Sequence, residues 1–194
     1  MALRVLKYPH PALRHKSKPL RRVDGELKDV IREMFDLMYR QKGVGLAANQ
    51  VDLPYRFFVI NPEGEPTKGR EFVFLNPVLE KRSGTAEAEE GCLSFPEIFA
   101  PVKRSAKVTV SAYDLDGQEI RCEFDGLMAR AVQHEYDHLD GVLFVDRLSP
   151  TGLLSVKEAL AELEREFEGD RQRGVIPDDQ KIASRLERLE QLRT

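Results

Sequence analysis

Two histidines four residues apart, with a glutamate directly after the first, are the residues of this sequence best suited to chemistry. His134, Glu135 and His138 lie in the segment His134-Glu135-Tyr136-Asp137-His138. On a helix, residues four apart share one face, so both imidazoles can reach one cation. Glu135 then lies beside the cation and can exchange a proton with water and a leaving group. The segment indicates a metal-dependent hydrolase, although alone it also fits the polar face of a core helix.

A catalytic metal site needs a third protein ligand and an open position. The candidates are Cys92, Cys122, a remaining histidine or a carboxylate. Cys92 follows Gly91 in the stretch 89–96, which we expect to be irregular and to let a thiolate approach a metal. Cys122 lies in an alternating stretch and shares a face with apolar neighbours, as a small core residue does. We therefore expect Cys92 to be the ligand.

His10 and His15 are weaker ligand candidates. They lie in a basic, proline-containing N-terminal segment and have no partner at ligand spacing. We expect these two side chains to be solvated or to cap a helix.

Composition limits the class of protein. A chain of 194 residues with 41% hydrophobic content predicts one main domain. Its 33 acidic and 30 basic residues give a net charge of -3, which provides no basic field for DNA or anionic lipid. The N-terminus lacks the apolar run of a signal peptide, and no stretch approaches the roughly 20 apolar residues of a membrane span. We expect a cytoplasmic protein without a DNA or membrane partner.

Hydrophobic periodicity predicts the helices that must position these residues. Apolar steps of three and four predict one helix over about 25–40 and another over about 126–140, which carries the histidines. An amphipathic helix is expected over about 153–167, after Ser149-Pro150. A linker at 169–177 and a short helix over 178–194 complete the tail.

Short runs rich in β-branched and aromatic residues predict strands. The runs at 106–113 and 119–124 are expected to form a hairpin, because Asp116-Gly117 suits a tight turn. The segment 43–50 lacks periodicity and is expected to be a close-packed loop. Together the elements predict an α+β fold with antiparallel sheets around the central helix of the histidines. The other two predicted strands are 56–60 and 71–79.

Three segments together resemble the three motifs of the bacterial peptide deformylases in wording, order and spacing. The likeness extends over about the first 150 residues and leaves the tail unmatched. It implies a catalytic domain at 1–150 and a helical extension at 151–194 that is not a separate domain. The segments are Gly43-Val44-Gly45-Leu46-Ala47-Ala48-Asn49-Gln50, Glu90-Gly91-Cys92-Leu93-Ser94 and Gln133-His134-Glu135-Tyr136-Asp137-His138-Leu139-Asp140-Gly141.

The resemblance implies removal of the N-terminal formyl group from the initiator methionine of new polypeptides, with release of formate. Cys92, His134 and His138 would hold the metal, and a metal-bound hydroxide would attack the formyl carbon with Glu135 as general base and acid. The metal, the amide of Gln50 and the backbone N–H of Leu93 would hold the oxyanion. Neutral fixed donors of this kind contribute roughly 3 to 4 kcal/mol each where water is excluded. Without the other motifs, Gln50 also fits a loop residue that satisfies backbone groups.

A formyl carbon bears only hydrogen, so a cramped site can admit it and exclude larger acyl groups. Four of the residues implied to contact substrate match the family's methionine pocket, and each also fits core packing. The family often has Thr in place of Asn49 and a basic residue near Phe99, so peptide contacts there are expected to differ. The residues implied to contact substrate are Val44, Gly45, Glu90, Gly91, Leu127, Arg130 and Ala131, of which Val44, Leu127, Arg130 and Ala131 match the methionine pocket.

The metal and the partners are less constrained. A thiolate with two imidazoles suits zinc, and similar sets bind iron, cobalt or nickel. The family implies Fe(II) as the native ion and N-formyl-Met peptides of nascent chains as substrate. Some members are thought to dock on the ribosome through the C-terminal helix, yet here eight basic and ten acidic residues follow position 150. We expect the tail to cover the core or to form a dimer contact, so the protein is a monomer or a dimer.

Two other functions compete with this hypothesis. A zinc endopeptidase would use the same base but would need an extended cleft and a His or Glu as third ligand. A structural metal site in a binding module would have a closed tetrahedral ligand set, and Glu135 would be dispensable.

Overall fold

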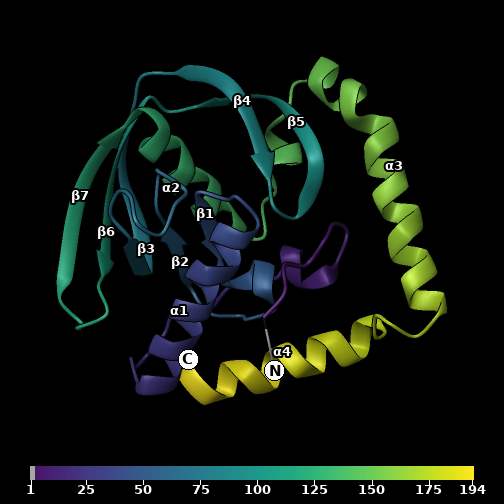
Figure 1. Ribbon diagram of the computed structural model, residues 1–194, viewed down its shortest axis with the longest axis horizontal. Coiled ribbons are helices and arrows are strands. Elements are labelled where there is room, and N and C mark those ends of the chain that lie inside the picture. The colour runs from purple at the N-terminus through teal and green to yellow at the C-terminus, as the bar shows by residue number, and fades with distance from the viewer. Residues whose placement is uncertain (1–2) are drawn as a thin grey trace.

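The helix that carries the two histidines, α2 (Gly126–Leu139), lies between two antiparallel sheets. The computed structural model describes residues 3–194, and Figure 1 shows the arrangement. The larger sheet has the strand order β1-β2-β3-β6-β7, and the smaller sheet pairs β4 with β5. The predicted α+β fold is confirmed. The strands are β1 (Gly45–Ala47), β2 (Phe57–Ile60), β3 (Phe72–Ser83), β4 (Ala86–Cys92), β5 (Phe95–Arg104), β6 (Lys107–Tyr113) and β7 (Glu119–Asp125).

The other helices surround this centre. The predicted first helix is α1 (Gly25–Arg40), and Asp24 caps it by accepting a hydrogen bond from the backbone N–H of Leu27 at 2.9 Å. The predicted hairpin joins β6 to β7, and Gly117 has φ +74°, which glycine adopts without steric cost. The remaining helices are η1 (Pro11–Arg14), η2 (Ala48–Val51), η3 (Phe144–Arg147), α3 (Pro150–Gln172) and α4 (Asp179–Arg193).

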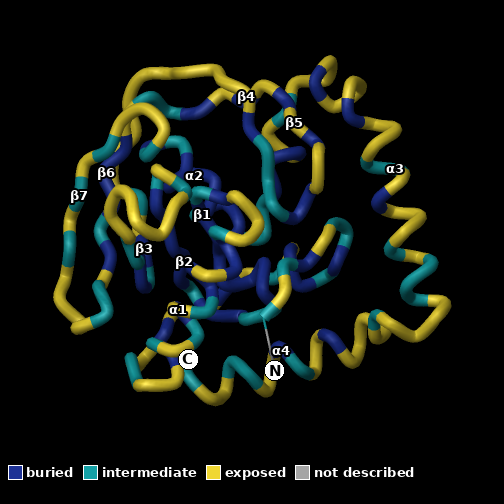
Figure 2. Tube along the Cα trace, in the orientation of Figure 1, coloured by how far each residue is buried: buried dark blue, intermediate teal, exposed yellow. Residues whose placement is uncertain are grey.

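One face of α2 is held against the larger sheet by apolar packing. Ala129, Val132 and Leu139 are fully buried and belong to one cluster with Phe58 and Phe74 of the sheet. Each buried large side chain of this kind contributes about 1.5 to 3 kcal/mol. The dark tube of Figure 2 follows this buried centre, and the packing fixes the direction in which the histidines point.

Two segments expected to be irregular contain strands. The segment 43–50 forms β1 and η2, because Gly45 to Ala47 pair with Ile60 to Phe58 of β2. The stretch 89–96 forms the end of β4, a turn and the start of β5. In both segments, hydrogen bonds between paired backbones hold the chain in an extended conformation, and this pairing requires no hydrophobic alternation.

The tail contains two helices that wrap around the body (Figure 1). The predicted linker at 169–177 is partly wrong, because α3 continues to Gln172 through exposed charged residues that favour a helix. The apolar residues Val156, Leu163, Ile182 and Leu186 are buried in one cluster with the N-terminal segment. Among residues 3–194, no helix combines the length and apolar composition needed to cross a membrane.

His10 is buried where the tail meets the N-terminal segment. Only 5% of the residue is exposed, and its Nδ1 accepts a hydrogen bond from the backbone N–H of Ala12 at 3.2 Å. It therefore caps η1 as expected, but it is not solvated. Burial lowers the pKa of His10 to about 4, and the nearby positive charges of Arg185 and Arg4 add to this effect.

We predict that His10 makes the fold sensitive to acid. The unfolded chain binds a proton at His10 below its ordinary pKa near 6.5, whereas the folded chain does so only near 4. Stability from this group is therefore complete above about pH 7 and falls as the pH drops, by about 1 to 2 kcal/mol at pH 5. His10→Asn, which can still cap η1, should lose less stability than the wild type between pH 7.5 and 5 in urea unfolding. Identical losses in both proteins would contradict the prediction.

Candidate active site

The structure brings Cys92, His134 and His138 together. Cys92 ends β4, and the two histidines project from α2 toward it. The Cys92 Sγ lies 3.3 Å from the His138 Nε2, and the ligand atoms of the three residues all lie within 4.8 Å of one another. Separations of this size suit sulfur and nitrogen ligands placed about 2.0 to 2.3 Å from one tetrahedral ion.

The chemistry of these donors also fits a divalent transition-metal ion. One thiol and two imidazoles are ligands of intermediate softness, which zinc and iron accept. Both histidines are buried, and the Nδ1 of His134 is engaged by Glu90, so its other ring nitrogen is left for an ion. The site thus offers three protein ligands.

Glu90 orients His134 from behind. Its carboxylate Oε2 lies 3.1 Å from His134 Nδ1, and it receives two further hydrogen bonds from Arg104, at 2.7 and 2.9 Å. Burial alone would raise the pKa of Glu90, but the hydrogen bonds to His134 and Arg104 outweigh it and lower the pKa to about 2. Glu90 is therefore ionised, and it fixes the ring orientation of a ligand as a carboxylate does behind a metal-bound histidine.

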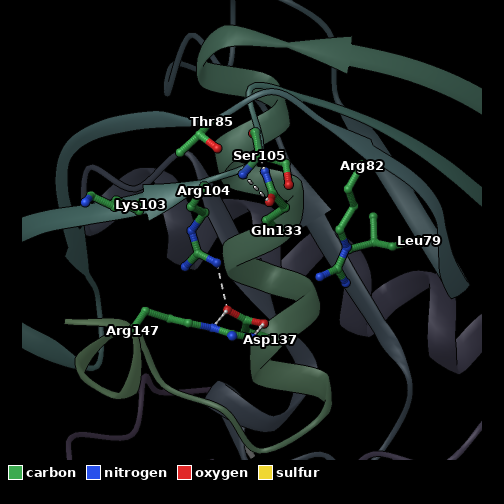
Figure 3. Close-up of a pocket in the computed structure, with 9 residues that line it drawn as sticks. All are labelled: Leu79, Arg82, Thr85, Lys103, Arg104, Ser105, Gln133, Asp137 and Arg147. Atoms are coloured by element: carbon green, nitrogen blue, oxygen red, sulfur yellow. Dashed lines mark hydrogen bonds and ion pairs between the residues drawn. The ribbon is translucent and has the colours of Figure 1, made fainter. Parts of the chain in front are cut away.

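A chain of ion pairs continues from Glu90 to the surface. Arg104 also donates to Asp137 at 2.7 Å, and Arg147 donates to the same carboxylate at 2.7 and 3.0 Å. Figure 3 shows both arginines converging on Asp137 at the wall of a pocket of about 260 Å³. Because Arg104 and Glu90 are almost fully buried, loss of one partner should cost about 3 to 5 kcal/mol.

Glu135 lies on the same helix with its carboxylate against β1. Burial raises the pKa of Glu135 to about 7, and the positive charges of His134 and Arg104 limit the rise. A buried carboxyl group beside three possible metal ligands is placed to accept and return a proton. Its buried Oε2 has no hydrogen-bond partner within residues 3–194. A Cβ at Gly45 would lie 2.5 Å from Glu135 Oε1, so only glycine leaves room for the carboxylate.

Gln50 and Leu93 lie on the two turns that flank Cys92 and the histidines. The Gln50 Oε1 accepts a hydrogen bond from the backbone N–H of Ala47 at 2.9 Å. This bond directs the Nε2 toward Ser94 Oγ, at 3.1 Å, and toward Cys92 Sγ, at 3.5 Å. Leu93 follows Cys92 directly in the turn between β4 and β5. The Gln50 amide and the residue Leu93 therefore lie next to the three possible metal ligands.

These groups border one cavity of about 500 Å³. Cys92, His134, Glu135, Gln50 and Leu93 line it. Phe99, which is 60% exposed, lies at its edge with the ring against Gly91. Every residue implied to contact substrate also lines the cavity: Val44, Gly45, Glu90, Gly91, Leu127, Arg130 and Ala131.

Several contributors to the site escaped the sequence analysis. Ser94 and Asp137 lie inside the recognised segments, so their positions gave a signal that was not used. Arg104 gave none, since it lies 14 residues from Glu90 in a stretch not expected to be a strand. Cys122, expected to be a core residue, is half-buried and packs against the apolar cluster of the larger sheet.

Comparison with known proteins agrees with this geometry. Residues 2–153 match the family model described as polypeptide deformylase. A peptide deformylase of Rhodopirellula baltica is 46% identical over 194 residues, which cover 100% of this chain and 96% of the relative. Arabidopsis thaliana has a relative named peptide deformylase 1B, chloroplastic/mitochondrial, 41% identical over 96% of this chain and 67% of that protein.

Solved structures show the same similarity. A crystal structure of a variant of the A. thaliana enzyme has a TM-score of 0.85 at 41% identity, over 91% of this chain and 96% of that one. A peptide deformylase from Legionella pneumophila has a TM-score of 0.78 at 38% identity, over 87% of this chain and 98% of that one. The chain therefore belongs to the polypeptide deformylase family, the hydrolases that remove the N-terminal formyl group from newly made polypeptides.

Proposed function

We propose that Cys92, His134 and His138 hold one divalent metal ion in this chain and that Glu135 transfers the protons of deformylation. The observation that carries the proposal is the meeting of three ligand atoms within 4.8 Å of one another beside the substrate cavity. The buried carboxylate of Glu135, with one oxygen unpartnered within residues 3–194, supports its role.

Hydrolysis of a formamide requires activation of water, stabilisation of an oxyanion and protonation of the leaving amine. A bound divalent ion supplies Lewis acidity, which makes water a nucleophile near neutral pH. Glu135 accepts the proton of that water and returns it to the amine nitrogen as the C–N bond breaks. The Nε2–H of Gln50, whose amide is held by the Ala47 backbone before the substrate arrives, and the backbone N–H of Leu93 would donate to the oxyanion.

Crowding around Glu135 explains the choice of a formyl group. Gly45 lies against the carboxylate, and a Cβ at Gly43 would lie 2.7 Å from the Leu93 side chain. A formyl carbon, which carries only hydrogen, fits where an acetyl methyl group would clash. Val44, Leu127, Arg130 and Ala131 border the same cavity and are assigned to the methionine side chain, with Gly45, Glu90 and Gly91 beside the peptide.

The proposed native ion is Fe(II). The set of one thiolate and two imidazoles is compatible with Fe(II), Zn, Ni or Co, so metal availability in the cell determines which ion is loaded. Support for Fe(II) comes from the resemblance of the three motifs to those of the bacterial enzymes. The choice of Fe(II) is therefore a proposal about the identity of the ion, since Fe(II), Zn, Ni and Co could all use the same three ligands.

Two competing functions lack support. An endopeptidase with this helix would need a His or Glu as third ligand, and the third group near the histidines is Cys92. A purely structural metal site would be closed, whereas a cavity of about 500 Å³ borders Cys92 and His134.

For location and partners we propose a cytoplasmic enzyme that acts on nascent N-formyl-Met chains. The organellar location in the name of the plant relative belongs to that protein. The tail carries eight basic and ten acidic residues, which gives electrostatic attraction to ribosomal RNA no support. Transient ribosome association and a monomeric or dimeric state both stay predictions.

Replacement of Glu135 tests the proton-transfer role. Glu135→Ala should lower kcat for a formyl-Met peptide by about 10²- to 10⁴-fold, because the general base is lost. Metal content and the circular dichroism spectrum should not change, since the carboxylate is not a ligand. Glu123→Ala, on the exposed face of β7, is the matched control. Full activity of Glu135→Ala would refute the mechanism.

A comparison of the two cysteines tests the ligand assignment. Cys92→Ala should reduce bound metal to well below one ion per chain, because a site with two protein ligands binds weakly. Cys122→Ala removes a thiol that packs on the sheet and should leave metal content unchanged. Metal analysis after dialysis measures the difference. Equal metal content in the two variants would reject Cys92 as a ligand.

A further inference from the structure

The tail helices reach the oxyanion-binding turns through the N-terminal segment. The Tyr8 hydroxyl donates a hydrogen bond to Glu164 of α3 at 2.9 Å, and the Lys7 ammonium lies 3.6 Å from Glu166. One turn farther along α3, Phe167 packs edge-to-face on His10. The segment 6–10 is therefore held from outside by α3.

The same segment joins the two turns that carry the proposed oxyanion donors. The backbone N–H of Leu6 donates to the carbonyl of Gln50 at 2.8 Å, and that of Tyr8 donates to the carbonyl of Ser94 at 2.9 Å. The ring of Tyr8 also stacks on Phe95 at 4.9 Å between centroids. Gln50 and the residue after Leu93 are thus tied to one short piece of chain.

The second tail helix contacts the Gln50 turn directly. Arg185 of α4 forms an ion pair with Asp52, the residue that ends η2 two positions after Gln50. Asp52 has φ +68° and ψ 28°, a left-handed conformation that few residues with a side chain adopt, although aspartate does so more often than most. Its backbone N–H donates to the carbonyl of Asn49 at 3.2 Å and closes the turn. An ion pair that holds the Asp52 side chain helps to keep the backbone of this residue in the left-handed conformation.

Further contacts hold α4 in place. Arg193 pairs with Asp24 and Glu26 at the start of α1, and its carbonyl accepts a hydrogen bond from the Arg21 backbone. The buried side chains of Ile182 and Leu186 flank Arg185 on the inner face of the helix. Arg185 is therefore presented to Asp52 by a helix anchored at several points.

We propose that Arg185 is a positioning residue for Gln50, and that contacts from the C-terminal helices hold the oxyanion-binding turns of the enzyme in position. The inference rests on the oxyanion role proposed for Gln50. Arg185 fixes Asp52, Asp52 closes η2, and η2 aims the Gln50 amide at the reacting carbonyl. The tail then contributes to turnover without contacting substrate, because a donor must be fixed before charge develops to be fully effective.

The alternative is that the Arg185–Asp52 pair only adds stability. A partly exposed ion pair of this kind adds little to the stability of a fold. The two roles differ in what they change. A stabilising role lowers the melting temperature and leaves kcat unchanged, whereas a positioning role lowers kcat and leaves KM and metal content unchanged.

The experiment is a double-mutant cycle in the full-length, metal-loaded enzyme. Gln50→Ala should lower kcat for a formyl-Met peptide by about 10²- to 10³-fold, as loss of one oxyanion donor does. Arg185→Met should lower kcat by about 10-fold with KM and bound metal unchanged, because the donor is displaced but still present. In the Gln50→Ala background, Arg185→Met should change kcat by less than about twofold. Asp52→Asn, which tolerates the left-handed conformation, should reproduce the effect of Arg185→Met.

Arg188→Met is the matched control, since Arg188 is exposed on the same helix and has no ion pair within residues 3–194. It should leave kcat unchanged. Three results would overturn the positioning role of Arg185. They are an unchanged kcat in Arg185→Met, an equal loss of kcat in Arg188→Met, and losses of kcat that multiply in the double variant. If Gln50→Ala itself retains full activity, the oxyanion role of Gln50 is wrong, and the positioning role of Arg185 is wrong with it. A loss in Gln50→Ala without one in Arg185→Met leaves the proposed function intact.

Discussion

The carboxylate of Glu90 is buried beside the proposed metal ligands, and its charge must be balanced within the protein. Two hydrogen bonds from Arg104, an ion pair with Arg130 and one contact with His134 Nδ1 provide that balance. The same contacts join the smaller sheet, which carries Glu90 and Arg104, to α2, which carries His134. One buried charge therefore determines both how the smaller sheet packs on the helix and which way a proposed ligand faces. The position of Cys92 follows, because it lies two residues after Glu90 on the same strand.

The reaction chemistry depends on how closely the surrounding backbone approaches this centre. Gly45 admits the Glu135 carboxylate, and the bond from the Ala47 backbone to Gln50 Oε1 turns the amide Nε2 toward Cys92. Both effects need β1 and η2 in fixed positions. Pairing with β2 holds β1, while the N-terminal segment and α4 hold η2 from the other side. The proposed deformylase site is thus enclosed by elements from every part of the chain.

The sequence predicted most of this protein because its strongest signals are local. Periodicity located α1 and α2, the Asp-Gly turn located the β6-β7 hairpin, and three motifs located the residues around the cavity. The strands β1 and β4 were missed because pairing partners, and not alternation, create them. β5 does alternate buried and exposed residues from Ile98 to Arg104, but the prolines at 96 and 101 argued against a strand. Arg104 was missed because its contact with Glu90 depends on the tertiary fold: in the register of β4 and β5 it lies opposite Ala86, and its side chain reaches Glu90 four residues along. The contact of Arg185 with Asp52 depends on how α4 docks, which no local pattern encodes.

The central claim is that a metal ion held by Cys92, His134 and His138 enables this chain to deformylate peptides. The most direct measurement is formate release from a formyl-Met peptide by protein purified without air, with metal content determined on the same sample. The account predicts one divalent ion per chain, formate release in proportion to bound metal, and loss of both on chelation with recovery when Fe(II) is returned. Full formate release by protein without bound metal would contradict it.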